Sequence, residues 1–561
     1  MLISTRIPSL RSLQWSSKSQ QSIGSIKDQL DSCSLKDGGH NNCPTYQKTQ
    51  LPTRIICIGP EGETVHLYET DESEQGVYAA LSHCWGPPGL HPVRITESNI
   101  SLFKEPTPIS GLTAVFQDAI WLCKQLGISN IWIDSLCIIQ DDSQDWQNES
   151  SKMAQYYSNA YFTIAVERSW DSNTHFLRQA EERWQPVSYS TTDSNGTVVK
   201  YIIQEHYSHE AYLTGLSNYF QRGKDILLSR GWCLQEAVLS TRVIHFTPSD
   251  IIWECKSVME CLDQHYHPDK ADWNIRKMLT KLESWSSPEQ DLQVAVHQVW
   301  TGLVKKYTLR NLSFQEDKLP AFGGIASYFS RFYGEKYLAG IWGSQLCSGL
   351  CWKVVDTGQT RIRSLALEEP TAPSWSWASL PVGVGVEGPE YVDRQDFAEG
   401  YELEILEAQC QLSSPKSPFG RVTQGHILLK APIFQVRLDC VSLSPKHPDW
   451  IQHIISWGDE VKMPQESTVV FRHDTLLAVH EGRVIRATSG SQLGYLCNVS
   501  SFQGGAWFLW LDGLKDDCIE GLVLGQGVGT SVFQRLGYVK IANIQVDTFP
   551  SNPCRTLLEL V

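Results

Sequence analysis

Glu236 occupies the position in this chain that most strongly suggests chemistry. It follows Trp232 by four residues in an apolar run, and residues with this spacing share one face of a helix. An aromatic ring beside a carboxylate could hold a sugar or a nucleotide. The alternative is an amphipathic helix in which Glu236 pairs with Arg230 or Arg242. Spacing alone favours this second interpretation.

Two other apolar runs end in polar or aromatic side chains. The first, a predicted strand, ends at Ser82 and leads into a turn that begins at Trp85. The second predicted strand begins at Asn130 and ends at Asp134. Ligands of open α/β sheets bind beyond the carboxyl ends of the strands, so Asp134 is either a site acid or a residue that braces the following loop. A covalent nucleophile is disfavoured, because neighbours on a strand such as Ser82 and His83 point to opposite faces.

Cysteine and histidine occur in two groups that could ligate a metal. Cys33, His40 and Cys43 could hold zinc with a fourth ligand from elsewhere, but their spacing matches no closed zinc site. We therefore predict ordinary loop residues there and no metal. A second group fits no paired-ligand pattern either, and we assign it to the core and the surface. The members of that second group are Cys255, Cys261, His265 and His267.

Composition limits the class of protein. A length of 561 residues allows about three or four domains. The formal net charge of −15 disfavours nucleic acid as a partner, because binding to its phosphates depends on Lys and Arg. The 16 Cys are scattered singly, which is typical of reduced thiols in the cytoplasm. No apolar run reaches the ~20 residues of a membrane span. Residues 1–27 lack Asp and Glu, and a disordered tail is favoured over a targeting segment.

The hydrophobic pattern predicts the elements that position these residues. Between residues 77 and 166, strands alternate with helices, which indicates a parallel α/β sheet, and a polar insertion follows. A mainly helical region comes next, and the alternation near the end of the chain indicates a β-rich domain. The predicted domains are 1–50 (a tail with a small Cys/His motif), 51–255 (the α/β domain), 256–399 (the mainly helical region) and 400–561 (the β-rich domain).

Three segments carry a family resemblance. They are YAALSHCWG at 78–86, IWIDSLCIIQDD at 131–142 and LSRGWCLQE at 228–236. In this order they resemble the heterokaryon-incompatibility (HET) domain family of filamentous fungi. The last segment also resembles the Trp-Cys-x-x-Glu segment of Toll/interleukin-1 receptor (TIR) domains. The chain differs from TIR domains in a long insertion before Leu228 and in having Gln235 directly before the acid.

The resemblance implies a function and a set of roles. HET domains imply a fungal protein of non-self recognition and programmed cell death. The likeness to TIR domains implies a flavodoxin-like parallel sheet that cleaves NAD at its nicotinamide–ribose bond, with NAD as the substrate and no cofactor. In TIR domains a glutamate of this segment contacts the ribose hydroxyls, and the matching residue here is Glu236. Trp232 would then form a wall of the pocket, with Ser82, Trp85 and Asp134 opposite.

A non-catalytic module is the alternative to an NAD glycohydrolase. It would trigger cell death through a protein partner or the product of an incompatible allele, and a homo-oligomer is compatible with it. A regulator within a specialised-metabolism locus is a weaker alternative. For each of these we expect a cytoplasmic protein.

Overall fold

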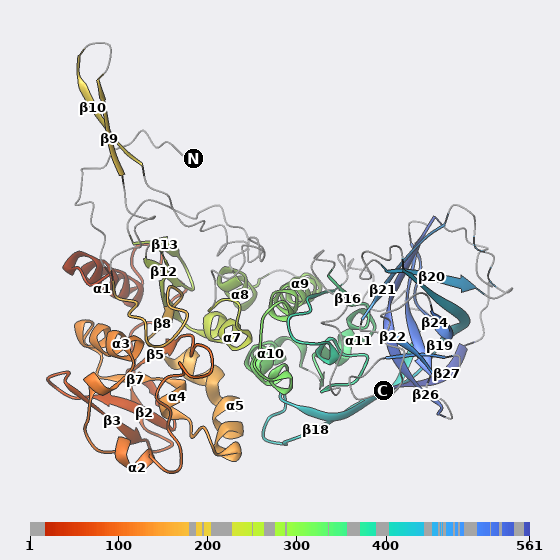
Figure 1. Cartoon of the computed structure of the whole chain (residues 1–561), viewed down its shortest axis with the longest axis horizontal. Helices are drawn as coiled ribbons and strands as arrows, with labels where there is room; N and C mark the ends of the chain where they lie inside the picture. The colour runs from red at the N-terminus through yellow and green to blue at the C-terminus, as the bar shows by residue number, and fades with distance from the viewer. Residues whose placement is uncertain are drawn as a thin grey trace. The chain divides into compact units, whose positions relative to one another are not determined.

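A computed structural model of the whole chain is shown in Figure 1. The chain divides into two compact units, Met1–Ser284 and Trp285–Val561. The domain boundaries placed after residues 50, 255 and 399 stay predictions. The structure describes residues 17–178, 187–192, 196–203, 227–248, 251–262, 275–286, 289–334, 336–355, 371–388, 403–442, 451–457, 461, 463, 467–474, 477–480, 483–486, 502–515, 518–526, 530–543 and 555–561.

A nine-stranded sheet forms the centre of the first unit, with the strand order β13-β12-β11-β8-β5-β7-β2-β3-β6. Two short pairs, β1–β4 and β9–β10, lie outside it, and β9–β10 falls within the predicted polar insertion. The strands of this unit are β1 (Thr49–Gln50), β2 (Arg54–Ile58), β3 (Thr64–Glu69), β4 (Gln75–Gly76), β5 (Ala79–Ser82), β6 (Thr107–Pro108), β7 (Asn130–Trp132), β8 (Phe162–Val166), β9 (Val187–Thr192), β10 (Val198–Ile203), β11 (Arg242–Phe246), β12 (Ile251–Cys255) and β13 (Met259–Cys261).

The large sheet is mixed rather than parallel. Its central strands β11, β8, β5 and β7 run parallel to their neighbours in this group. The strands on either side pair antiparallel. The prediction of a parallel sheet is therefore correct for the centre and wrong for the flanks. The reason is that two tightly connected pairs, β2–β3 and β11–β12, join the same sheet, and short connections enforce antiparallel pairing.

The parallel centre has a doubly wound order. Along the chain these strands come in the order β5, β7, β8, β11. Across the sheet they lie in the order β7-β5-β8-β11, which is 2-1-3-4 when they are numbered along the chain. Flavodoxin-like sheets share this order, and their strand order reverses between the first and third strands. The ligand crevice of such sheets lies beyond the carboxyl ends of those two strands, which here are β5 and β8.

Helices cover both faces of this centre. Figure 1 shows α3 on one side of the strands and α5 and α7 on the other. The α5 helix begins after Asp142, whose carboxylate accepts hydrogen bonds from the backbone N–H groups of Gln144 at 2.8 Å and Asp145 at 3.2 Å. The helices of the first unit are α1 (Gln20–Leu35), α2 (Ile100–Phe103), the 3-10 helix η1 (Ile109–Gly111), α3 (Ala114–Gln125), α4 (Asp134–Cys137), α5 (Ser143–Asn159), α7 (Gly231–Leu239) and α8 (Ile275–Glu283).

Burial explains why the central strands are almost continuously apolar. Every residue of β5, β8 and β11 is buried, as expected for parallel strands covered on both faces. One strand is shorter than predicted, because β7 ends at Trp132 and Asp134 is the first residue of α4. The Asp134 carboxylate accepts a hydrogen bond from the N–H of Ser135 at 2.7 Å, which favours the turn over continued strand.

The second unit combines helices with a ten-stranded sheet. That sheet has the order β18-β19-β27-β26-β25-β24-β23-β22, with β20 on β19 and β21 on β26, so the prediction of a β-rich C-terminal region is confirmed. The elements are α9 (Glu289–Thr308), η3 (Gln315–Asp317), α10 (Pro320–Tyr333), β14 (Tyr337–Leu338), β15 (Ile341–Trp342), η4 (Gly343–Gln345), α11 (Leu346–Gly349), β16 (Lys353–Val354), η6 (Trp377–Ser379), β17 (Val386–Glu387), β18 (Glu404–Leu412), β19 (Val422–Ser442), β20 (Ile451–Trp457), β21 (Thr468–His473), β22 (Leu477–His480), β23 (Arg483–Arg486), β24 (Phe502–Lys515), β25 (Cys518–Gln526), β26 (Val532–Ala542) and β27 (Arg555–Leu560).

A buried ion pair lies in this second unit. Arg535 and Asp474 are both fully buried, and Arg535 Nε donates to Asp474 Oδ2 at 2.7 Å. The guanidinium also donates to the backbone oxygen of Leu350 at 2.5 Å and lies 3.4 Å from the centroid of the Trp352 ring. The guanidinium is therefore enclosed by protein, and replacing Arg535 alone should lower the free energy of unfolding because the Asp474 carboxylate would stay buried without its cation. In the part of the chain that the structure describes, no helix is long and apolar enough to cross a membrane.

Candidate active site at the carboxyl edge of the sheet

The carboxyl ends of the central strands bring together three residues that the sequence analysis singled out. Ser82 ends β5, Asp134 follows β7, and Glu236 lies on α7, the helix that precedes β11. The hydroxyl of Ser82 hydrogen-bonds to the Glu236 carboxyl group, and the charge of Asp134 acts on the same group. The predicted grouping at this edge therefore holds for these three side chains.

Glu236 lies in a nearly closed environment. Its relative exposure is 6%, and the α7 residues before it, Cys233, Leu234 and Gln235, are buried as well. The hydroxyl of Tyr157, on α5, lies between the Glu236 carboxyl group and the backbone oxygen of Leu81, which it reaches at 3.1 Å. The carboxyl group therefore points into the protein, between α7, α5 and the end of β5.

This environment raises the pKa of Glu236 from 4.5 to about 7. Burial is the largest cause, because it penalises the charged form. The hydrogen bond from Ser82 lowers the pKa, the negative charge of Asp134 raises it, and the positive charge of Arg230 lowers it. Near neutral pH the carboxyl group can therefore exist in either protonation state, a property common among catalytic acids and bases.

Asp134 both braces its loop and faces the candidate site. Trp85 donates its indole N–H to Asp134 Oδ2 at 3.0 Å, so the two predicted site residues are in direct contact. Burial raises the pKa of Asp134, while the charge of Arg230 and the hydrogen bonds from Ser135 and Trp85 oppose that rise. The two roles considered for Asp134 are therefore not exclusive.

Arg230 is the cation of this group. Its Nη1 donates to the backbone oxygen of His83 at 2.5 Å, which fixes the guanidinium beside the turn after β5. The charge of Arg230 acts on both Asp134 and Glu236. The alternative pairing of Glu236 with Arg242 is wrong, because Arg242 Nη2 donates instead to the backbone oxygen of Pro44 at 2.5 Å.

The neighbours of Ser82 do not form a nucleophile–base pair. The ring of His83 packs edge-on against Phe116 of α3, at 5.2 Å between ring centroids. Both ring nitrogens of His83 lack a hydrogen-bond partner among the described residues, and burial lowers the pKa of His83 to about 3. Burial also raises the pKa of Cys84 to about 11, which disfavours a thiolate. These environments agree with the argument against covalent catalysis.

Trp232 lies one helical turn before Glu236 on α7. It is partly buried, and its ring packs edge-on against Trp146 of α5 at 6.0 Å between centroids. This contact holds α7 against α5. The predicted role of Trp232 as a pocket wall stays a prediction.

Sequence reasoning missed a second polar cluster near this edge. Nδ1 of His245, on β11, lies 2.7 Å from Glu167 Oε1, and its Nε2 lies 3.0 Å from Glu254 Oε2. Arg276 Nε lies 3.2 Å from the other oxygen of Glu254. Burial lowers the pKa of His245, but the two carboxylates outweigh it and raise the pKa to about 9. A histidine and a glutamate, each within one of two successive apolar strands and diagonal to each other in the antiparallel register, were the signal available in the sequence.

The residues best suited to hold a metal lie away from this edge. The structure brings Cys33, His40 and Cys43 together with Cys255, a grouping that was not predicted, while the absence of a metal there stays a prediction. Cys255 belongs to the second predicted group, whose members His265 and His267 lie outside the described residues. The reason for the miss is distance along the chain, because Cys255 lies 215 residues from His40.

The comparisons with known proteins add one finding. Residues 78–236 match the family model for the heterokaryon incompatibility protein (HET), and Ser82, Trp85, Asp134, Trp232 and Glu236 all lie within that span. The predicted family resemblance is confirmed, and the match indicates a role in heterokaryon incompatibility. The curated proteins and the solved structures gave no match. The likeness to TIR domains therefore stays a prediction.

Proposed function

We propose that this chain, whose residues 78–236 match the HET family, is a cell-death effector of non-self recognition that hydrolyses NAD through Glu236. The observation that carries the proposal is the buried acid Glu236, a residue 6% exposed, at the edge where doubly wound sheets bind ligands. Its pKa is raised to about 7, so it ionises in the range where a cytoplasmic enzyme works.

The chemistry matches a single ionised carboxylate. When the bond between ribose C1′ and the nicotinamide nitrogen breaks, nicotinamide leaves as a neutral molecule and positive charge builds on the ribose. Oxygen of a water molecule then bonds to C1′, and a proton of that water passes to the solvent. An ionised Glu236 would stabilise the positive charge and accept hydrogen bonds from the ribose hydroxyls. Its low-polarity surroundings strengthen that stabilisation.

The neighbouring groups would tune this carboxylate. The hydroxyl of Ser82 hydrogen-bonds to the Glu236 carboxyl group, and burial, assisted by the charge of Asp134, keeps the pKa of that group near neutrality. Arg230 supplies a fixed positive charge beside both acids, of the kind that holds the phosphates of a dinucleotide. Because only the ionised form stabilises positive charge, kcat/KM should rise as the pH passes about 7.

The test is nicotinamide release from NAD by the purified full chain. Loss of one electrostatic contact to the transition state lowers kcat by about 10²–10³-fold, and we expect a loss of this size for Glu236→Ala. Glu69→Ala is the matched control, because it removes the same side chain from a half-exposed position on β3, outside the group around Glu236. Thermal unfolding of all three proteins shows whether a lost activity reflects lost folding.

Toxicity on expression separates the two classes of function. For an NAD hydrolase, Glu236→Ala abolishes both nicotinamide release and toxicity. If the wild type and Glu236→Ala release nicotinamide equally, Glu236 has no part in the reaction. If neither protein cleaves NAD and both kill the cell, the chain acts as a non-catalytic module through a partner.

A further inference from the structure

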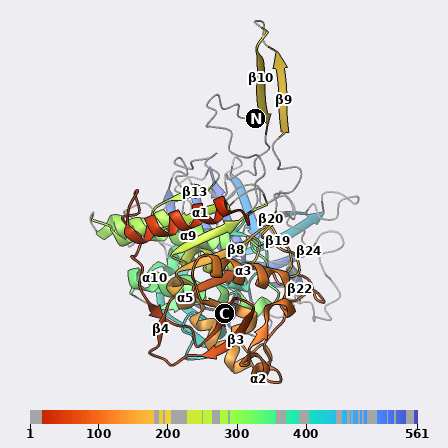
Figure 2. The ribbon, with the colours of Figure 1, turned by 90° about the vertical axis from the view of Figure 1, so that its left-hand side faces the viewer.

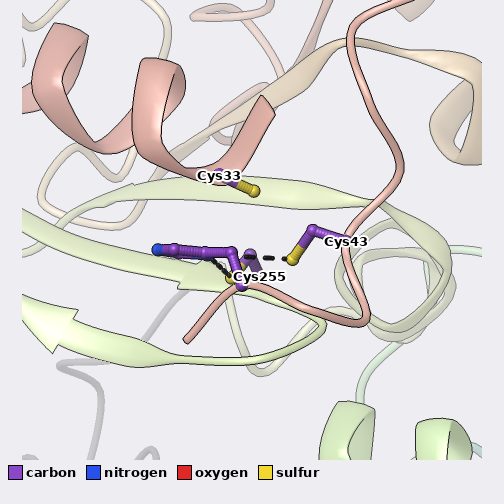
Figure 3. Close-up of side chains that lie close together, drawn as sticks. Cys33, Cys43 and Cys255 are labelled. Carbon is purple, nitrogen blue, oxygen red and sulfur yellow. Dashed lines mark hydrogen bonds between the residues drawn. The ribbon is translucent and has the colours of Figure 1, made fainter. Parts of the chain in front are cut away.

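Four buried metal-ligating side chains meet at one point of the first unit. Cys33 lies near the end of α1, His40 and Cys43 lie in the turn that follows, and Cys255 ends β12. Figure 3 shows the three sulfur atoms turned toward one another from these segments. Their sulfur atoms and a ring nitrogen of the histidine all lie within 4.8 Å of one another, and the relative exposure of the four residues is 0–3%.

The distances fit tetrahedral coordination. Zinc–sulfur bonds of about 2.3 Å and zinc–nitrogen bonds of about 2.0–2.1 Å place two sulfurs roughly 3.8 Å apart and a sulfur and a nitrogen roughly 3.6 Å apart. Nδ1 of His40 lies 3.3 Å from Cys255 Sγ and 3.8 Å from Cys43 Sγ. These separations bracket the tetrahedral value, so a zinc ion needs only small adjustments of the side chains.

The backbone is shaped to return the chain to Cys33. Lys36 caps the C-terminus of α1 in the left-handed region at φ 60°, and Gly38 and Gly39 follow at φ 60° and 96°. This run of left-handed residues reverses the chain immediately after the helix. A hydrogen bond from Cys43 N–H to the backbone oxygen of His40, at 3.0 Å, then closes the turn that carries both ligands.

The surroundings would stabilise bound thiolates. Arg242 Nε donates to Cys33 Sγ at 3.1 Å, and Val258 N–H donates to Cys255 Sγ at 3.3 Å. Ser257 Oγ lies 3.4 Å from Cys43 Sγ. Three thiolates, a neutral imidazole and Zn²⁺ together carry one negative charge, which the buried guanidinium of Arg242 balances. Donors to the sulfur atoms are the usual outer contacts of a thiolate metal site.

We propose that Cys33, His40, Cys43 and Cys255 bind one zinc ion. Three thiolates and one imidazole in a tetrahedron favour zinc over harder cations such as Mg²⁺ and Ca²⁺. All four coordination positions are filled by protein, so the site is structural rather than catalytic. It is independent of NAD chemistry.

The zinc ion joins the two flanks of the HET-matched region. Three ligands precede residues 78–236 and the fourth follows them. Figure 2 shows α1 beside the β13 end of the large sheet, and α1 also contacts β12. Binding therefore fastens α1 and its turn to the sheet edge, and removal of the metal should increase hydrogen exchange in α1.

The test measures metal in the purified full chain. Elemental analysis should find about one zinc per chain. After chelation under reducing conditions, cobalt(II) should restore one equivalent of binding, with the thiolate charge-transfer and tetrahedral ligand-field absorption of a sulfur-rich site. His40→Ala should lose most of the bound metal, whereas His40→Cys keeps four ligands and should retain it. Cys57→Ser, a partly buried thiol of β2 outside the group, should bind like the wild type.

Two results would overturn the zinc site. The first is folded chain with almost no zinc and no thiolate absorption on cobalt addition. The second is mass-spectrometric detection of a disulfide among Cys33, Cys43 and Cys255 in protein prepared under reducing conditions. Because neither readout involves NAD, failure here leaves the proposed hydrolase untouched. Because the cobalt spectrum uses the unsubstituted chain, unfolding of a variant cannot mimic a negative result.

Discussion

Replacing Glu236 with glutamine should stabilise the first unit at alkaline pH and not at acid pH. The folded protein raises the pKa of this carboxyl group from 4.5 to about 7. Between these values the folded state keeps a proton that the unfolded state has lost. The folded state therefore favours the neutral carboxyl group. The resulting contribution to the free energy of unfolding is fully present below pH 4.5 and is lost as the pH rises through about 7.

The size of the effect follows from the shift. One pKa unit corresponds to about 1.4 kcal/mol, so the rise to about 7 makes the ionised carboxylate cost about 3 kcal/mol of folding free energy above that pH. Glutamine resembles the neutral acid in shape and cannot ionise. We expect Glu236→Gln to gain up to about 3 kcal/mol near pH 8.5 and almost nothing near pH 4.5.

Hydrogen exchange localises this measurement to the correct unit. Urea unfolding of the full chain is followed by hydrogen exchange in peptides that cover β5 and α7, so the measurement reports the first unit alone. The wild type and Glu236→Gln are compared at the same pH, which cancels the intrinsic exchange rate. Glu149→Gln is the matched control. Glu149 is buried on α5, where Lys152 Nζ lies 3.2 Å from its carboxylate and the Tyr156 hydroxyl donates to it at 2.8 Å. Its replacement should destabilise the unit.

Two results would refute the reasoning on Glu236. If glutamine destabilises the unit by the same amount at both pH values, the carboxylate is better solvated by Ser82 and Arg230 than its burial implies. If glutamine stabilises the unit equally at both pH values, the gain comes from packing and not from removed charge.

Three further predictions follow from buried charges. Asp134→Asn removes a charge that raises the pKa of Glu236, so the midpoint of the kcat/KM profile for nicotinamide release should move below that of the wild type; an unchanged midpoint would contradict the coupling. The pKa of His245 is raised from 6.5 to about 9, so its stabilising charge is present below pH 6.5 and lost as the pH rises through about 9; urea midpoints of the first unit should fall across that range, and constant midpoints would exclude a charged imidazole. Arg535→Leu leaves Asp474 buried without its cation and should cost about 3–5 kcal/mol in the urea unfolding of the second unit, with part of the loss recovered when Asp474 is also replaced by leucine; a cost below about 1 kcal/mol would show that water reaches the site.

The candidate edge was largely predictable because its residues end parallel strands. Ser82 and Asp134 follow apolar runs whose period indicates strands, and the carboxyl ends of neighbouring parallel strands meet at one edge of a sheet. Glu236 could be placed on a helix, on the same face as Trp232, by its spacing alone. Its acid–base behaviour could not, since the pKa depends on burial and on groups from β5, α4 and α5 that only the fold assembles.

The pairing of β2 with β7 and the thiol cluster were not predictable for a related reason. Hydrophobic alternation marks β2 as a strand but does not specify that Ile56 pairs antiparallel with Ile131 of β7. The spacing of Cys33, His40 and Cys43 showed three ligands without a fourth. The fourth, Cys255, reaches them only because β12 and α1 lie together.

Local sequence thus determined the elements, the family match and the chemical types present at the sheet edge. These properties depend on residue type and on periods of two or 3.6 residues, which are legible along the chain. Tertiary structure decided which distant groups meet: the acid, cation and hydroxyl around Glu236, and the three sulfurs and one imidazole, in which Cys255 lies 215 residues from His40. Contacts, burial and the local electric field depend on which residues lie close together in space. The spacing of residues along the chain does not specify these neighbours.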